Sequence, residues 1–234
     1  MSSGKELVAA LLDGRVMERP PFIPILGGFA QRMGQMSETD FRENPQLHAR
    51  ALLQTADALN ADALTVGVGC SIEVGIEACK RLAPVLQGRG LVACLSRPEP
   101  TSARAYCEEG ADMVLVLEVD PAESGRFRTL SNVCKYYRVP VLLAAAGLEA
   151  PSALAQQLKL DGAIVPWPTG DEPGIIGGGL GACPNDVAER GPGSPPRESR
   201  FFWSFPGEIA PGSSPETLVR LGDMLTGQSG GVPG

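Results

Sequence analysis

The feature of this 234-residue chain that most constrains its fold is a repeated alternation of short, unbroken apolar segments with amphipathic segments of helical periodicity. One repeat takes about thirty residues, the length of a strand–helix unit. Unbroken Val, Leu and Ile runs are typical of strands buried on both faces, and such strands form parallel sheets covered by helices. The predicted strands span residues 22–26, 63–68, 91–95, 113–119, 139–146, 162–167, 174–180 and 201–205.

Helical patterns precede and separate these strands. Residues 3–6 (Ser-Gly-Lys-Glu) fit a capping box that begins a lead-in helix, and Asp13-Gly14 ends its periodicity. Residues 27–33 are predicted to be a loop that leaves the first strand. Further helices are predicted at residues 44–59, 74–86, 101–109, 127–136 and 151–158, with a last one that starts after the Ser/Pro signals of residues 213–215 and ends near Leu225.

Eight strands in this alternation predict a (β/α)8 TIM barrel, an α/β fold. The length suits one domain, which we place at residues 1–226 and follow with a flexible tail at residues 227–234. A doubly wound open sheet is the alternative architecture. It would need a glycine-rich phosphate turn after the first strand, and Gly27-Gly28 lacks the required G-x-G-x-x-G spacing.

Charge and cysteine usage narrow the class of partner. The formal net charge is -7 and no Lys/Arg-rich run is present, so neither a nucleic acid nor an anionic membrane is the expected partner. The six cysteines form no C-x-x-C pair, and the N-terminus lacks the apolar core of a signal peptide, which predicts reduced thiols and a cytoplasmic protein. No segment reaches the roughly 18 apolar residues of a membrane span. A small molecule is the expected ligand.

Candidate site residues follow the predicted strands, because the strand exits of such a barrel converge on one face. We expect Glu73, Glu208 and Cys70 to be catalytic, the two glutamates through acid/base chemistry. The alternative is that each charged residue is a solvated loop charge. The expected substrate-binding residues are Gln31, Arg32, Arg97, Glu118, Trp167 and Trp203.

His48, the only histidine, is predicted to lie at the surface, on a helix outside the barrel. A histidine-dependent triad and a histidine-rich zinc site are therefore not expected. No histidine is then available to activate Cys70, so this residue is either a nucleophile or ligand at a strand exit, or a small buried thiol. No metal site is predicted.

Several segments resemble the uroporphyrinogen decarboxylase superfamily, and within it the corrinoid (methylcobamide) methyltransferases. Residues 18–21 (Glu-Arg-Pro-Pro) are similar to the Asp-Arg-Pro-Pro segment that leads into their first strand. Residues 70–74 are similar to their second strand exit, whose glutamate would be Glu73. Residues 139–147 resemble their fifth strand, and residues 204–218 their final Pro-Gly-Cys-Glu-Ile-x-Pro stretch.

The departures from this resemblance concern the metal and the substrate. Those methyltransferases hold a catalytic zinc through a His-x-Cys pair and a later cysteine, and Ala144, Ala146 and Gly207 stand at the corresponding positions. The decarboxylases are associated with an Arg-x-x-x-Arg loop that this chain replaces with Gln31 and Arg32, so a polycarboxylate porphyrinogen is not the expected ligand. The chain is also shorter than typical members, which predicts an open or partner-completed site.

Three functions remain open at this stage. The resemblance implies a zinc-free methyltransferase-like enzyme for a small molecule, with no tightly bound cofactor and with a corrinoid (cobalamin) carried by a partner protein. The first alternative is a decarboxylase or other lyase that acts on a small carboxylate between two carboxylates. The second is a non-catalytic, ligand-binding barrel. A homo-oligomer is compatible with each of them.

Overall fold

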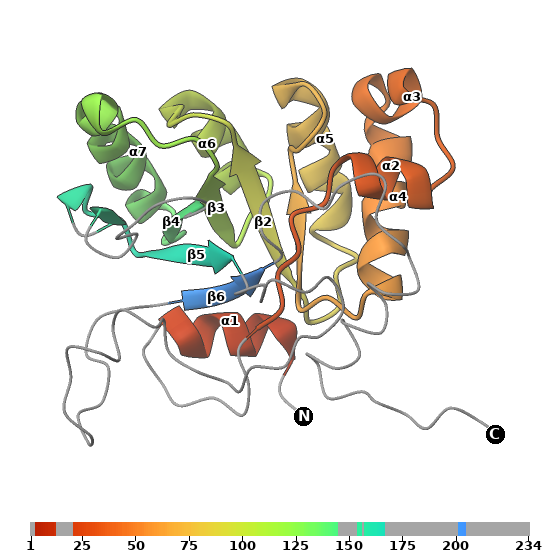
Figure 1. The fold of residues 1–234 in the computed structure, drawn as a ribbon, viewed down its shortest axis with the longest axis horizontal. Coiled ribbons are helices and arrows are strands. Elements are labelled where there is room, and N and C mark those ends of the chain that lie inside the picture. The colour runs from red at the N-terminus through yellow and green to blue at the C-terminus, as the bar shows by residue number, and fades with distance from the viewer. Residues whose placement is uncertain (1–2, 13–20, 145–153, 156, 167–200, 205–234) are drawn as a thin grey trace, which may run out of the picture.

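The computed structural model describes residues 3–12, 21–144, 154–155, 157–166 and 201–204. Six strands form one parallel sheet in sequential order, and helices connect most of them (Figure 1). The strands are β1 (Ala63–Val66), β2 (Gly90–Leu95), β3 (Met113–Val116), β4 (Val141–Ala144), β5 (Gly162–Pro166) and β6 (Phe201–Ser204). The helices are α1 (Gly4–Leu12), α2 (Gly28–Met33), α3 (Glu38–Glu43), α4 (Pro45–Ala58), α5 (Ile72–Leu82), α6 (Pro100–Glu108) and α7 (Ser124–Tyr136), with a 3-10 turn, η1 (Pro121–Glu123), before α7.

The strand order shows that the sheet is of the barrel type. Each strand pairs in parallel with the next one in the chain, for example Leu64 with Leu91 and Val92 with Met113. Right-handed crossovers in such an order put every connecting helix on the same side of the sheet. Figure 1 shows α4 to α7 on one side of the strands, while α1 runs beneath them. The doubly wound alternative is therefore wrong, because it needs helices on both faces.

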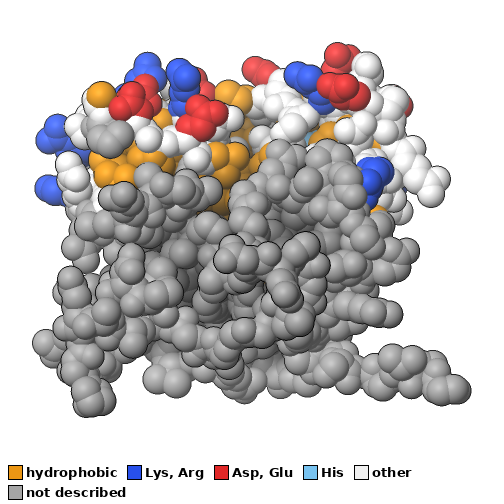
Figure 2. All heavy atoms as spheres, in the orientation of Figure 1, with side chains coloured by type: hydrophobic (Ala, Val, Ile, Leu, Met, Phe, Trp, Pro, Cys, Tyr) orange, Lys and Arg blue, Asp and Glu red, His pale blue; other side chains and the backbone are white. Residues whose placement is uncertain are grey.

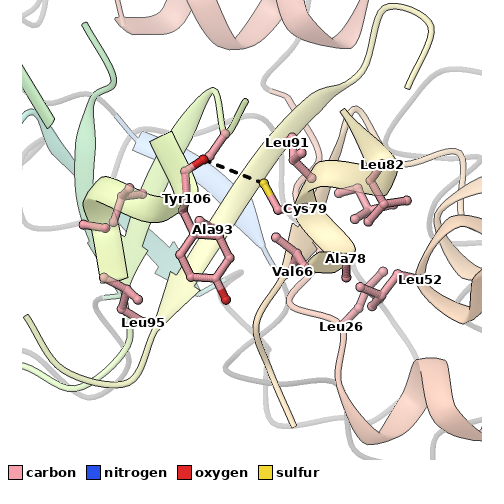
Figure 3. Close-up of a cluster of buried hydrophobic side chains, with 14 of the residues drawn as sticks. Leu26, Leu52, Val66, Ala78, Cys79, Leu82, Leu91, Ala93, Leu95 and Tyr106 are labelled. Carbon is pink, nitrogen blue, oxygen red and sulfur yellow. Dashed lines mark hydrogen bonds between the residues drawn. The ribbon is translucent and has the colours of Figure 1, made fainter. Parts of the chain in front are cut away.

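The core has two layers that alternate along each strand. In β2, Leu91, Ala93 and Leu95 face the helices, whereas Val92 and Cys94 belong to a second buried cluster. Figure 3 shows the helix-facing layer, where residues such as Leu52 and Ala78 meet these strand side chains. The second cluster is the interior of the curled sheet, and α1 contributes Val8 to it.

The predicted first strand is only partly a strand. Residues 21–26 are buried and extended, but Phe22 alone forms a bridge. Pro24 has no N–H to donate to a regular ladder of backbone hydrogen bonds. The Thr65 side chain makes the hydrogen bonds to this segment instead. The Thr65 hydroxyl donates to the Pro24 carbonyl at 3.0 Å and accepts from the Leu26 N–H at 2.9 Å. The segment is thereby held beside β1.

The turns that lead into the strands repeat one geometry. Asn60, Gly110, Arg138 and Lys159 each have positive φ after a helical segment, and the next N–H donates to the carbonyl five residues earlier, as in Ala61 to Ala56. After three of these turns an aspartate follows. Its N–H and carboxylate bind the backbone C=O and N–H of one residue on the neighbouring segment: Asp62 binds Phe22, Asp112 binds Leu91 and Asp161 binds Val141.

Helix α1 closes the amino edge of the sheet beside these aspartates. Its capping box is confirmed, because the Glu6 carboxylate accepts from the Ser3 N–H at 2.7 Å and the Ser3 hydroxyl accepts from the Glu6 N–H at 3.3 Å. Lys5 pairs with Asp112 at 2.6 Å. A Cβ on Gly4 would lie 2.1 Å from the Asp62 carbonyl oxygen, so only glycine permits this close approach.

Two sequence predictions about the architecture need correction. Residues 27–33 are not a loop: residues 28–33 form α2, because Phe29 and Ala30 bury themselves against α4 and this packing outweighs the low helix propensity of Gly28. The predicted eighth strand, β6, pairs directly with β5 through Ala163 and Phe201. The predicted seventh strand, residues 174–180, lies outside the described residues. A closed eight-stranded barrel is thus not confirmed.

None of the helices in the described ranges is long and apolar enough to cross a membrane.

Candidate functional site

A pocket of about 360 Å³ opens at the carboxyl edge of the sheet, beside the ends of β1 and β2. In barrels of this type the carboxyl edge is where catalytic residues gather. The volume lies within the range of small-molecule sites, about 300–1,000 Å³. We call it the rim pocket. Its lining residues are Gly67, Cys70, Ile72, Cys94, Leu95, Ser96, Arg97, Pro98, Glu99, Pro100, Tyr106 and Arg126.

The wall of the rim pocket depends on a close contact between α6 and α5. Tyr106 is 1% exposed, and its hydroxyl reaches the backbone of both Gly67 and Gly75. A Cβ on Gly75 would lie 2.0 Å from that hydroxyl oxygen, so the two helices approach only because this position has no side chain. Burial raises the pKa of the Tyr106 hydroxyl, and this group therefore stays protonated at neutral pH.

Two of the predicted substrate-binding residues contact each other, and one of them, Arg97, lines the pocket. The Arg97 Nε lies 3.4 Å from the Glu118 Oε2, with the two side chains 72% and 66% exposed. A second arginine, Arg126 of α7, borders the pocket and pairs with Glu123 at 3.0 Å. Figure 2 shows acidic and basic side chains interspersed along the upper face of the described part. Exposed ion pairs contribute only about 0–1 kcal/mol, so either guanidinium can exchange its carboxylate for an anionic ligand.

The prediction that His48 lies at the surface is wrong. His48 is fully buried, because α3 covers the side of α4 that the sequence pattern assigned to solvent. Phe41 of α3 packs on the imidazole with ring centroids 4.3 Å apart, and its carbonyl oxygen lies 2.9 Å from the His48 Nδ1. The other ring nitrogen, Nε2, lies 3.6 Å from the Cys70 Sγ. A histidine is therefore in contact with Cys70, contrary to the sequence interpretation.

Both members of this pair are neutral at rest. Burial raises the pKa of the Cys70 thiol to about 12, with a smaller opposing effect from Arg42. Burial also lowers the pKa of His48, and its bond to the Phe41 carbonyl opposes this in part. The resting pair is therefore a thiol beside an uncharged imidazole. Cys70 itself is half-buried and lines the rim pocket.

Glu73 lies on the outside of the first turn of α5. It is exposed, and its pKa is lowered by a hydrogen bond from its own backbone N–H and by another from the Ser71 hydroxyl. Ser71 is the N-cap of α5, with its hydroxyl accepting from the Val74 N–H. At neutral pH Glu73 is thus a carboxylate that can orient a cationic or hydrogen-bonding group, and a weak proton donor.

The remaining predicted residues are placed as follows. Gln31 donates through its Nε2 to the Met36 carbonyl at 3.3 Å, which closes the turn after α2. Arg32 is exposed, with its guanidinium 5.8 Å from the centre of the Phe29 ring. Trp203 stands in β6, paired in register with Val165. Trp167 and Glu208 lie outside the described residues.

Sequence reasoning missed His48, Tyr106 and Arg126 as neighbours of the site. For His48 a signal was present: residues 48, 52, 55 and 56 share one face of α4, at the spacing of a buried stripe. Tyr106 and Arg126 lie on helices, several residues beyond the strand ends that they approach. Only the fold brings these two side chains to the pocket.

The described residues contain no cluster of three or more His, Cys, Asp or Glu side chains that could hold a metal ion. Ala144, the first of the three positions that correspond to zinc ligands in the methyltransferases, ends β4 and has no metal-binding atom. The other two positions, 146 and 207, lie outside the described residues.

Comparison with solved structures shows the fold. A methyltransferase from Methanosarcina mazei superposes with a TM-score of 0.67 and 12% sequence identity, over 98% of this chain and 100% of the other. The 3-hexulose-6-phosphate synthase from Salmonella typhimurium gives a TM-score of 0.52 and 16% identity, over 76% of this chain and 94% of the other. The chain has a TIM-barrel-like fold. No protein-family model matches the chain, and no curated protein does.

Proposed function

We propose that this protein is a methyltransferase-like barrel enzyme that binds a small anionic molecule in the rim pocket and exchanges its methyl group with a corrinoid on a partner protein. The observation that carries the proposal is the rim pocket itself, a small-molecule cavity at the catalytic edge of a barrel and bordered by two arginines. The full-length structural likeness to a methyltransferase supports the reaction class.

The charges around the pocket favour an anionic substrate. Arg97 and Arg126 approach it from two different elements, and both present planar guanidinium groups that bind carboxylate or phosphate bidentately. The pocket is also lined by Ile72 and Pro100, the first residues of α5 and α6, where the helix dipoles are positive. The Glu99 carboxylate accepts a hydrogen bond from the Ser102 hydroxyl at 2.9 Å, which orients the carboxylate towards α6.

The size of the pocket separates the substrate from the corrinoid. About 360 Å³ accommodates a small molecule and is too small for a corrin macrocycle with its side chains. A corrinoid presented at the open edge by a partner is compatible with this geometry, and its cobalt would supply the methyl donor or acceptor. In this scheme the two arginines hold the anion, and apolar residues such as Leu95 exclude water from the methyl group.

Glu73, which is a carboxylate at neutral pH, would orient the substrate. In this scheme the following residues keep the roles predicted for them from the sequence: Glu208, Gln31, Arg32, Trp167 and Trp203. A zinc-dependent step is not part of the scheme, because Ala144 offers no ligand atom at the described position.

The test is methyl transfer between methylcobalamin and small anions in the presence of the purified protein. Free methylcobalamin stands in for the protein-bound corrinoid, 3-mercaptopropionate serves as an anionic acceptor, and the change in the corrinoid absorption spectrum reports the reaction. A double variant, Arg97→Ala with Arg126→Ala, should lose about tenfold or more of the rate. Arg81→Ala is the matched control, because Arg81 forms an exposed pair with Glu77 near the opposite end of α5.

An absence of transfer in both directions, with methylated small carboxylates and cob(I)alamin as well as with methylcobalamin, would overturn the proposal. Release of carbon dioxide from a small carboxylate would then favour the lyase alternative. Binding of 3-mercaptopropionate without turnover would favour the non-catalytic barrel.

A further inference from the structure

The imidazole of His48 is fixed in one tautomer by its surroundings. A carbonyl oxygen only accepts hydrogen bonds, so the Nδ1 that lies 2.9 Å from the Phe41 carbonyl carries the proton. In a neutral ring the lone pair is then on Nε2. That nitrogen lies 3.6 Å from the Cys70 Sγ, within hydrogen-bonding range for sulfur. The thiol therefore donates to a basic nitrogen whose orientation is set from the opposite side of the ring.

The thiol of this pair is accessible to a ligand, whereas its base is not. Cys70 borders the rim pocket, immediately before the N-cap of α5, while His48 is buried between α3 and α4. A molecule in the pocket can meet the sulfur without reaching the imidazole. This division, with a half-buried nucleophile that lines the pocket and a fully buried base held by a third group, is the arrangement that nucleophilic catalysis requires.

The groups around the pair are few and mostly uncharged. Arg42 of α3 is the cation that acts on Cys70, and the protonated Tyr106 hydroxyl of α6 lines the same pocket. Cys94 of β2 is a second pocket thiol, and the Glu73 carboxylate contributes to the raised pKa of the Tyr106 hydroxyl. In such a desolvated place a permanent thiolate is unfavourable, so the proton must leave as the new bond forms.

We propose that Cys70 and His48 form a nucleophile–base pair that accepts an alkyl group from a small anionic electrophile bound in the rim pocket. In the reaction the Cys70 Sγ attacks a saturated carbon, a sulfur–carbon bond forms, and the bond from that carbon to its leaving group breaks with both electrons going to the leaving group. The thiol proton moves to the His48 Nε2, which becomes an imidazolium, while the leaving group departs into the pocket as an anion. No redox partner is required.

The test follows alkylation of Cys70 by iodoacetamide against pH, with peptide mass spectrometry to separate it from the other cysteines. An unassisted thiol that is protonated throughout reacts about tenfold faster for each unit of pH. Base assistance by a neutral His48 predicts instead a rate that is nearly constant between about pH 7 and pH 9. A steep, unbroken rise with pH in the wild-type protein would overturn the proposal, and this measurement needs no variant.

A second test removes the basic Nε2 of His48 but keeps the hydrogen bond from this side chain to the Phe41 carbonyl. His48→Asn keeps an amide N–H that can donate to the Phe41 carbonyl and lacks the Nε2 lone pair. Alkylation of Cys70 should become steep in pH and fall about tenfold or more near pH 7. A free small-molecule thiol alkylated under the same conditions is the control for the intrinsic pH dependence of the reagent. An unaltered rate at Cys70 in a folded variant contradicts the role of His48.

The anionic preference has its own test with a matched pair of reagents. Iodoacetate should alkylate Cys70 faster than iodoacetamide relative to their rates with a free thiol, and Arg97→Ala with Arg126→Ala should abolish that ratio. A ratio that the double variant leaves unchanged would overturn the anionic part of the proposal. The outcome is separate from methyl transfer, since the pair can react with alkyl halides even where methylcobalamin is not a substrate.

Discussion

The two edges of the sheet are built on different principles. At the amino edge a single turn geometry recurs, and three aspartates fasten neighbouring segments through backbone groups. In the described part of the carboxyl edge the connections after β1 and β2 differ from one another, and a cavity there is lined by residues that include Gly67, Cys70 and Arg97, with His48 behind Cys70. Regular, satisfied hydrogen bonds hold the strands at one edge. The described connections at the carboxyl edge share no such hydrogen-bond pattern. Barrels in general divide stability and chemistry between their two edges in this way.

The largest difference between the edges should appear when one aspartate is removed from each. Asp62→Ala leaves the buried Phe22 N–H without its carboxylate acceptor and should lower the free energy of unfolding by about 2–3 kcal/mol. Asp120→Ala removes a bond of the same kind, from the Ala122 N–H, at the exposed carboxyl edge, and should lower it by less than about 1 kcal/mol. Urea denaturation measures both values. Equal losses would mean that the edges do not differ in stability.

The next effect in size is expected from the packing of α6 against α5 beside the rim pocket. Gly75→Ala places a methyl group against the Tyr106 hydroxyl and should destabilise the fold by about 1–3 kcal/mol. Tyr106→Phe removes that hydroxyl, so in its background the Gly75→Ala loss should shrink by about 1 kcal/mol or more. The four proteins form a double-mutant cycle measured by denaturation. Additive losses would contradict the contact.

The buried histidine should make the carboxyl side of the molecule sensitive to acid. Because burial lowers the pKa of His48 in the folded state, the unfolded chain binds a proton more readily, and stability is complete above the unfolded value of about 6.5. Stability is then lost as the pH falls through the folded pKa. Denaturation of the wild type and of His48→Asn between about pH 7.5 and pH 5 checks this. The variant should lose less stability on acidification, and a greater loss would reverse the assigned sign.

The smallest effect on stability is expected at the ion pair of the rim pocket. Arg97→Ala breaks the exposed contact with Glu118 and should change the free energy of unfolding by less than about 0.5 kcal/mol. The same variant should weaken the reaction of Cys70 with iodoacetate, measured by peptide mass spectrometry. A large loss of stability would show that Arg97 belongs to the framework and not to the site.

The sequence was informative where one pattern determines one element. Unbroken apolar runs predicted β1 to β6, and the capping box at Ser3 and Glu6 predicted the start of α1. The order of these elements then predicted the barrel-type sheet, because parallel strands buried on both faces need their helices on the outside. The first strand was overestimated at Pro24, where the missing N–H prevents a regular ladder.

The candidate site was harder to predict because it depends on what packs over a helix. The periodicity of α4 placed Leu52, Thr55 and Ala56 on the same face as His48, but it did not show that Phe41 of the short helix α3 would pack on the imidazole. The proximity of Arg97 to Glu118 followed from the strand order. The contact between His48 and Cys70 did not, since it joins a helix to a loop that follows a strand, and α3 is the element that fixes the imidazole from its other side.

The aspartate fastening at the amino edge has a consequence for how such a chain can be rearranged. Each aspartate binds the N–H and C=O of its neighbour, and Phe22, Leu91 and Val141 differ in shape although all three are buried and apolar. The two hydrogen bonds themselves exclude only proline at these positions, because proline lacks the N–H. Strand–helix units from other barrels that bring an apolar residue other than proline to the junction could therefore be exchanged with those of this chain by recombination.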